Sequence, residues 1–124
     1  MNPKITHLYF QQGASSVYLG SDDSPYHLFS LTLEGHWFPI ISLVLLPIKK
    51  DIWETHVSEL EKKHKRQGYG KFIYSAALNY ADCSRITICS SLNPSNSANR
   101  VWESLSKTHH IRKEKGRFVY GKKI

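Results

Sequence analysis

The chain has 124 residues, of which 40% are apolar and 22% are charged, and its formal net charge is +7. This length holds one compact core, so we expect a single domain over residues 1–124, and the apolar content excludes a disordered chain. The longest apolar stretch, 37–48, is too short to span a bilayer, so the sequence predicts a soluble protein with no membrane partner. No secretory signal is visible, and Cys83 and Cys89 form neither a disulfide pattern nor a zinc pattern; we therefore expect a cytoplasmic location and no metal.

Charge is distributed unevenly along the chain. Residues 1–48 hold one lysine against three acidic residues, a net charge of −2, whereas residues 49–124 hold sixteen lysines and arginines against seven acidic residues, a net charge of +9. The second part therefore indicates an anionic partner. Five of its cations gather beside Gly68 and Gly70: Lys62, Lys63, Lys65, Arg66 and Lys71. A solvent-exposed charged loop would give the same pattern.

The first half of the chain has the alternating pattern of strands. Residues 1–51 predict an N-terminal meander of three strands, at 17–19, 27–33 and 38–48. A fourth strand is expected over 52–60. Because side chains alternate along a strand, one of its faces would carry Glu54, His56, Ser58 and Leu60.

After this strand the spacing of the apolar residues changes from a period of two residues to one of 3.6 residues. Apolar residues after Gly70 predict a helix that ends near Asp82, and a short apolar strand is expected over 85–89. A strand, helix, strand order predicts a right-handed crossover with a parallel pair. A second helix, capped by Ser95 or Asn96, is expected to reach Leu105, and residues 106–124 predict C-terminal strands that turn at Lys115-Gly116. The fold class is therefore mixed α and β.

The segment Lys65-Arg66-Gln67-Gly68-Tyr69-Gly70-Lys71 joins a predicted strand to a predicted helix. The first amides of a helix lack partners within the helix, and glycines let the backbone approach phosphate oxygens closely. Neither the Walker pattern nor the dinucleotide fingerprint matches, because Phe72 and Ile73 stand where those motifs need other residues. The loop therefore predicts a pyrophosphate site of a different kind.

The motif Lys65-x-x-Gly68-x-Gly70, followed by Asn96-x-Ala98-x-x-x-Trp102, resembles the GNAT superfamily of acetyl-CoA-dependent N-acyltransferases. The resemblance implies an α/β (α+β) fold. Its sheet would be mixed and mostly antiparallel, with a central parallel pair splayed around the cofactor, two or more flanking helices, and N-terminal helices reduced or absent. Residues 52–105 would form the acetyl-CoA-binding core. The chain departs from the family pattern where Lys65 replaces Arg or Gln, where Trp102 replaces Tyr, and where Leu105-Ser106-Lys107 replaces Leu-Gly-Phe.

The resemblance also implies where acetyl-CoA, as co-substrate, would bind. The pantetheine arm would lie between the strand that ends near Leu60 and the strand at 85–89, and the pyrophosphate would lie on the amides of residues 67–71. Asn96 would contact the pantetheine or the far end of the coenzyme. The cofactor-binding residues would be Leu60, Lys62, Lys65, Arg66, Gln67, Gly68, Tyr69, Gly70, Lys71 and Asn96.

In such an enzyme a primary amine attacks the thioester directly, so a general base is needed to remove a proton from the ammonium form. The resemblance offers Glu54 and His56, while an exposed strand carboxylate and a structural imidazole are the alternatives. An indole does not act as an acid, so with Trp102 the leaving thiolate would take its proton from water, Ser95 or Tyr120. The alternative is a catalytically weak or inactive fold that acts as a module for sensing coenzyme A or for binding nucleic acid or protein. Trp102, like Tyr74, Tyr80 and Cys89, is expected in the core.

The sequence leaves the acceptor open. The amine would be carried by a small molecule, a protein or an aminoacyl-tRNA, and the basic C-terminal residues would either contact such a partner or form a polybasic tail without a catalytic role. A homodimer that pairs through terminal strands is a further expectation.

Overall fold

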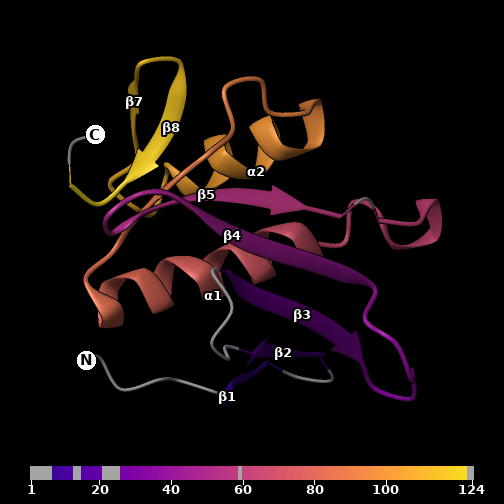
Figure 1. Ribbon diagram of the computed structural model, residues 1–124. Helices are drawn as coiled ribbons and strands as arrows, with labels where there is room; N and C mark the ends of the chain where they lie inside the picture. The colour runs from indigo at the N-terminus through magenta and orange to yellow at the C-terminus, as the bar shows by residue number, and fades with distance from the viewer. Residues whose placement is uncertain (1–6, 13–14, 21–25, 59, 123–124) are drawn as a thin grey trace.

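The computed structural model describes residues 7–12, 15–20, 26–58 and 60–122. Its strands form one sheet in the order β1-β2-β3-β4-β5-β6-β8-β7 (Figure 1). The strands are β1 (His7–Gln12), β2 (Ser15–Gly20), β3 (His27–Leu33), β4 (Ile41–Lys49), β5 (Ile52–Val57), β6 (Thr87–Cys89), β7 (Arg112–Glu114) and β8 (Arg117–Tyr120). The helical elements are η1 (Lys62–His64), α1 (Tyr69–Ser84) and α2 (Asn96–Leu105). Every described strand pair is antiparallel except β5 with β6, which confirms the mixed sheet.

The N-terminal half is a meander in which each strand pairs with the next. It has four strands rather than the predicted three, because β1 adds an edge strand along β2 that the sequence analysis did not identify. The third predicted strand was also placed too early. Gly35 adopts a φ of 82° and Pro39 has no amide hydrogen, so the segment before Ile41 forms a loop that leaves Trp37 94% exposed.

Strand β5 is shorter than predicted because it ends at Val57 instead of residue 60. The Ser58 amide still donates to the Ser42 carbonyl at 2.8 Å, but the Ser42 amide donates to the Ser58 hydroxyl, which replaces a backbone acceptor and ends the ladder. The predicted alternation holds within the strand. Thr55 is buried, and its neighbours Glu54 and His56 point to the opposite face of the sheet.

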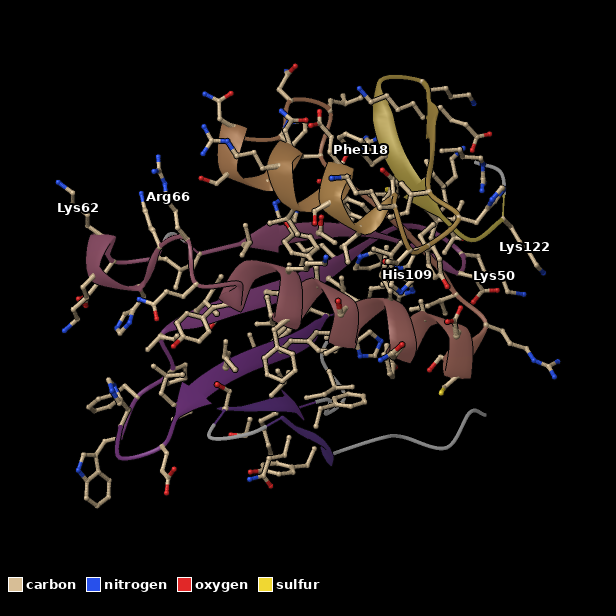
Figure 2. All side chains as sticks on the ribbon, turned by 180° about the vertical axis from the view of Figure 1, so that it is seen from behind. Lys50, Lys62, Arg66, His109, Phe118 and Lys122 are labelled. Atoms are coloured by element: carbon tan, nitrogen blue, oxygen red, sulfur yellow. The ribbon has the colours of Figure 1, made fainter. Side chains whose placement is uncertain are left out.

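Helix α1 packs on β3, β4 and β6, and α2 packs on α1. Figure 2 shows α1 lying across the strands with α2 beside it. The buried face of α1 carries Ile73, Tyr74, Ala76, Ala77, Leu78, Tyr80 and Ala81. The helix ends later than predicted, and Arg85 follows it in the left-handed region with a φ of 56°. The next strand therefore begins at Thr87 rather than at Arg85.

The C-terminal elements form as predicted. The Ser95 hydroxyl accepts a hydrogen bond from the Ala98 amide at 3.1 Å and caps α2. Lys115 and Gly116 both have positive φ, 51° and 80°, as a two-residue turn of the primed type requires, and they join β7 to β8. Strand β8 pairs with β6 at two positions, which places the hairpin at one side of the sheet with β7 as the edge strand.

None of the described helices is both long enough and apolar enough to cross a membrane.

Candidate functional site

The parallel strands β5 and β6 separate partway along their length. They pair at three positions, the last of which joins Glu54 to Cys89. Strand β6 ends there, while β5 continues to Val57 paired with β4 alone. A gap therefore opens in the sheet beyond Glu54, at the end that faces the start of α1.

A cleft of about 790 Å³ lies at this end, within the usual range for small-molecule sites. Its walls come from the start of β4, the end of β5, the glycine loop, the first turns of α1, and α2 as far as Ser104. Seven of the predicted cofactor residues line it: Leu60, Lys65, Arg66, Gly68, Tyr69, Gly70 and Lys71. The segment that follows β5, rather than the strand itself, brings Leu60 to the cleft.

The glycine loop presents backbone donors to the cleft. Gly68 precedes α1 with a φ of 84°, and the first amide bonded within the helix is that of Phe72, which donates to the Gly68 carbonyl at 3.0 Å. The amides of residues 69–71 therefore have no acceptor within the helix, and the N-cap residue Gly68 has no side chain that could cap them. At Gly70 a Cβ would lie 3.2 Å from Val101, so the glycine also lets α2 approach α1 closely.

Three predicted cofactor residues do not line the cleft. Lys62 is exposed in η1, and Figure 2 shows it extending outward from this end of the molecule. The Gln67 amide group donates to the Lys63 carbonyl at 2.9 Å and accepts from the Tyr69 hydroxyl at 3.2 Å. Asn96 is exposed at the first position of α2, while its neighbour Ser95 does line the cleft.

Glu54 and His56 lie on the face of β5 opposite to that of the buried Thr55, and their side chains contact each other. His56 Nε2 lies 2.7 Å from Glu54 Oε1, and Arg117 of β8 donates to Glu54 Oε2. The same guanidinium nitrogen of Arg117 donates to the Ser90 carbonyl at 2.8 Å. The side chains of Glu54 and Arg117 are only 17% and 15% exposed, against 45% for His56.

Sequence reasoning did not find this role of Arg117. It placed Arg117 in the basic C-terminal stretch, far along the chain from the glycine loop. The hairpin β7-β8 pairs with β6 through β8, and from there the Arg117 side chain reaches Glu54 on β5, 63 residues earlier in the chain. The β-prone run Phe118-Val119-Tyr120 indicated a strand, but nothing local indicated which residue Arg117 would contact.

No protein-family model and no curated protein matches the sequence. Solved structures do match the fold. The ribosomal-protein-S5-alanine acetyltransferase from Vibrio fischeri superposes with a TM-score of 0.68 over 86% of this chain and 84% of its own, at 9% identity. An acetyltransferase of the GNAT family from Staphylococcus aureus superposes with a TM-score of 0.59 over 79% and 69%, at 10% identity.

The chain has the GNAT fold. A third structure with this fold, a chimeric spermidine N-acetyltransferase from Vibrio cholerae and hSSAT, gives a TM-score of 0.58 over 79% of this chain and 69% of its own, at 13% identity. In this GNAT fold β5 and β6 are the splayed parallel pair, and the cleft lies at the open end of that pair.

Trp102 occupies the position where the GNAT resemblance expects tyrosine. Its side chain is fully buried, stacked on Phe118 with ring centroids 5.8 Å apart and edge-on to Tyr74 at 5.4 Å, which confirms the predicted core role. Tyr120 points elsewhere, because its hydroxyl donates to the carboxylate of Asp82 at 2.9 Å. Burial, together with Asp82, raises the pKa of Tyr120.

Tyr74 is the one aromatic hydroxyl besides Tyr69 among the described residues that line the cleft. Burial raises the pKa of Tyr74 to about 12, and a hydrogen bond with Thr55 opposes that shift. Tyr80 and Cys89 are buried as expected, and burial raises the pKa of the Cys89 thiol. In the part of the chain that the structure describes, no group of three His, Cys, Asp or Glu residues is placed to hold a metal.

Proposed function

We propose that the protein is an N-acetyltransferase that moves an acetyl group from acetyl-CoA to a primary amine. The observation that carries the proposal is the cleft, where the first amides of α1 and four basic side chains, those of Lys65, Arg66, Lys71 and Arg100, meet the open end of the splayed strands. The names of the structural neighbours, which are acetyltransferases acting on ribosomal-protein alanine and on spermidine, support the same class of reaction.

The residues present suit a coenzyme with an anionic head and an apolar arm. The amides of residues 69–71 would hold the diphosphate, and Lys65, Arg66 and Lys71 would neutralise it. Val57, Leu60 and Tyr74 offer apolar surface to the pantetheine arm. The arm would then follow the gap between β5 and β6 toward the face of the sheet that carries Glu54 and His56.

Acetyl-CoA supplies an electrophilic thioester carbonyl, and the protein has to deliver a neutral amine to it. Glu54 or His56 would accept the proton of the ammonium group, directly or through a water molecule; general bases of this kind contribute about 10²–10⁴-fold in rate. A backbone amide near Leu60 would stabilise the oxyanion. The reaction forms no covalent intermediate with the protein.

Two measurements on the same preparations test this proposal. Isothermal titration with acetyl-CoA is expected to show binding, and release of the coenzyme thiol is expected to require an amine acceptor. The double variant Glu54→Gln with His56→Ala should keep most of the affinity for acetyl-CoA and lose acetyl transfer, because neither residue lines the cleft. No binding at millimolar acetyl-CoA would end the proposal.

The second candidate is a catalytically idle fold that binds coenzyme A or nucleic acid. Burial of Trp102 in the usual tyrosine position favours it, because that position then offers no acid for the leaving thiolate. Cations at both ends of the molecule also favour it: Lys62 and Arg66 lie at one end, and Lys50 and Lys122 at the other (Figure 2). In this case the double variant would change nothing measurable, and nucleic-acid binding would weaken steeply with added salt.

The acceptor, the assembly and the location remain predictions. A screen of small-molecule amines, proteins and aminoacyl-tRNA as acceptors distinguishes the three classes expected from the sequence. Strands β1 and β7 are the edges of the described sheet and offer backbone groups for a homodimer, which analytical ultracentrifugation tests. Fluorescent tagging in cells tests the cytoplasmic location.

A further inference from the structure

Both carboxylate oxygens of Glu54 are engaged by neighbouring side chains. Oε1 lies 2.7 Å from His56 Nε2, and Oε2 accepts from Arg117. Arg117 is itself fixed by its second bond, to the Ser90 carbonyl, and by its place in the β7-β8 hairpin. A carboxylate held on both oxygens and largely buried has one orientation.

This contact determines which nitrogen of His56 carries the proton. An ionised carboxylate only accepts hydrogen bonds, so at 2.7 Å from Oε1 the Nε2 atom must be the donor. In the neutral ring the lone pair then belongs to Nδ1. Among the described residues Nδ1 has no hydrogen-bond partner, and the His56 side chain is 45% exposed. The nitrogen that is able to accept a proton is therefore the one that no described residue engages, on a side chain that is nearly half exposed.

We propose that His56 is the general base, acting through Nδ1, and that Glu54 and Arg117 are positioning residues that hold its ring in the Nε2-protonated form. The inference rests on the proposed acetyl transfer and assigns the roles within it. Each carboxylate oxygen of Glu54 already has one protein partner, and its side chain is only 17% exposed against 45% for His56, so His56 is the more accessible of the two bases.

The proton inventory of this scheme balances. His56 Nδ1 accepts one proton from the ammonium group, and the freed amine attacks the thioester carbonyl to form the C–N bond. The second proton leaves the nitrogen as the C–S bond breaks, and it ends on the coenzyme sulfur. His56 then returns its proton to solvent, while Glu54 stays ionised beside Arg117 throughout.

Steady-state kinetics separate the roles. His56→Ala is expected to lower kcat by about 10²–10⁴-fold with little change in KM for acetyl-CoA, and added imidazole should restore part of the rate. Arg117→Met and Glu54→Gln are each expected to lower kcat by about ten- to a hundredfold, since they misplace the base rather than remove it. Because Arg117 and Glu54 both act through the His56 ring, the variant that combines Arg117→Met with Glu54→Gln should lose no more kcat than the more damaging of the two single variants.

Lys113→Met is the matched control for charge. It removes one cation from the same hairpin, and Lys113 contacts the Phe118 ring rather than Glu54. The control should keep the wild-type kcat. The proposal is overturned if Arg117→Met behaves like Lys113→Met, or if Glu54→Gln causes the 10²–10⁴-fold loss while His56→Ala causes little.

A readout without substrate keeps this test distinct from the test of acetyl transfer. Long-range ¹H–¹⁵N correlation spectra of the His56 ring should show the Nε2-protonated form alone in the wild type and both neutral forms in Arg117→Met. If the protein transfers no acetyl group but the spectra agree, the proposed function fails while the positioning by Glu54 and Arg117 stands. A mainly Nδ1-protonated ring in the wild type would sink the inference, whatever the activity.

Discussion

Gly68→Ala tests whether the amides at the start of α1 hold the coenzyme. Gly68 has a φ of 84°, and a Cβ there would meet nothing within 4 Å, so the cost of the substitution lies in backbone conformation rather than in a clash. An alanine in the left-handed region costs about 1–2 kcal/mol, partly offset by its lower entropy in the unfolded chain, which leaves about 1 kcal/mol. For a chain of 124 residues this lowers Tm by about 4 °C.

The substituted loop is expected to relieve its strain by changing φ at residue 68, which turns the amides of residues 69–71 away from the cleft. Losing one charge-assisted hydrogen bond costs about 1.5–3 kcal/mol, so the Kd for acetyl-CoA should rise by at least tenfold in isothermal titration. Gly68→Asn should retain more affinity, because asparagine tolerates positive φ.

Gly35→Ala is the control with the same conformational cost. Gly35 has a φ of 82° and equally open surroundings, but it lies between β3 and β4 and does not line the cleft. Scanning fluorimetry should show a similar drop in Tm for both variants, with a changed Kd only for Gly68→Ala. Equal affinity in the two variants would refute the assignment of these amides to the diphosphate.

Three further predictions concern the packing around the cleft. In Tyr74→Phe the absorbance step of a tyrosine that ionises near pH 12 should disappear. Because the pKa of Tyr74 in the folded protein lies about two units above the ordinary value of 10.0, the wild type should lose about 3 kcal/mol of stability relative to the variant as pH rises from 10 to 12. Equal stability of the two proteins at alkaline pH would contradict the burial of this hydroxyl. Trp102→Ala should lower the free energy of unfolding by about 3–5 kcal/mol in urea titration, whereas Trp102→Tyr should not raise kcat, since residue 102 is buried away from the cleft; a gain in turnover would show that this position reaches the leaving group. Ser95→Ala removes the cap of α2 and should cost about 1 kcal/mol in the same titration, and an unchanged midpoint would contradict the hydrogen bond to Ala98.

Local signals predicted the parts of the fold that depend on local physics. The glycine loop, both helices and the Lys115-Gly116 turn each need particular backbone angles or a 3.6-residue stripe, and these show in the sequence. The ends of the elements were less certain. Strand β5 stops early because the Ser58 hydroxyl accepts the hydrogen bond of the Ser42 amide. A contact of this kind does not appear in the pattern of apolar and polar residues along the sequence.

Long-range contacts account for the parts of the candidate site that were missed. Glu54 and His56 were singled out by alternation on one strand, but Arg117 reaches Glu54 through the pairing of β6 with β8, which only the topology defines. Tyr74 was expected only in the core. It is buried, and it also forms part of the cleft wall because α1 starts at the open end of the splayed strands.

The attachment of the β7-β8 hairpin has a consequence for heat tolerance. Strand β8 is attached by more than its two ladder positions with β6: the Phe118 amide donates to the Ser90 hydroxyl at 3.0 Å, the Ser90 amide donates to the Phe118 carbonyl at 2.9 Å, and Phe118 and Val119 are buried. The hairpin that carries Arg117 is therefore part of the core and should melt together with the sheet rather than before it. Warming should accordingly leave Arg117 beside Glu54 up to the temperature at which circular dichroism reports loss of the fold.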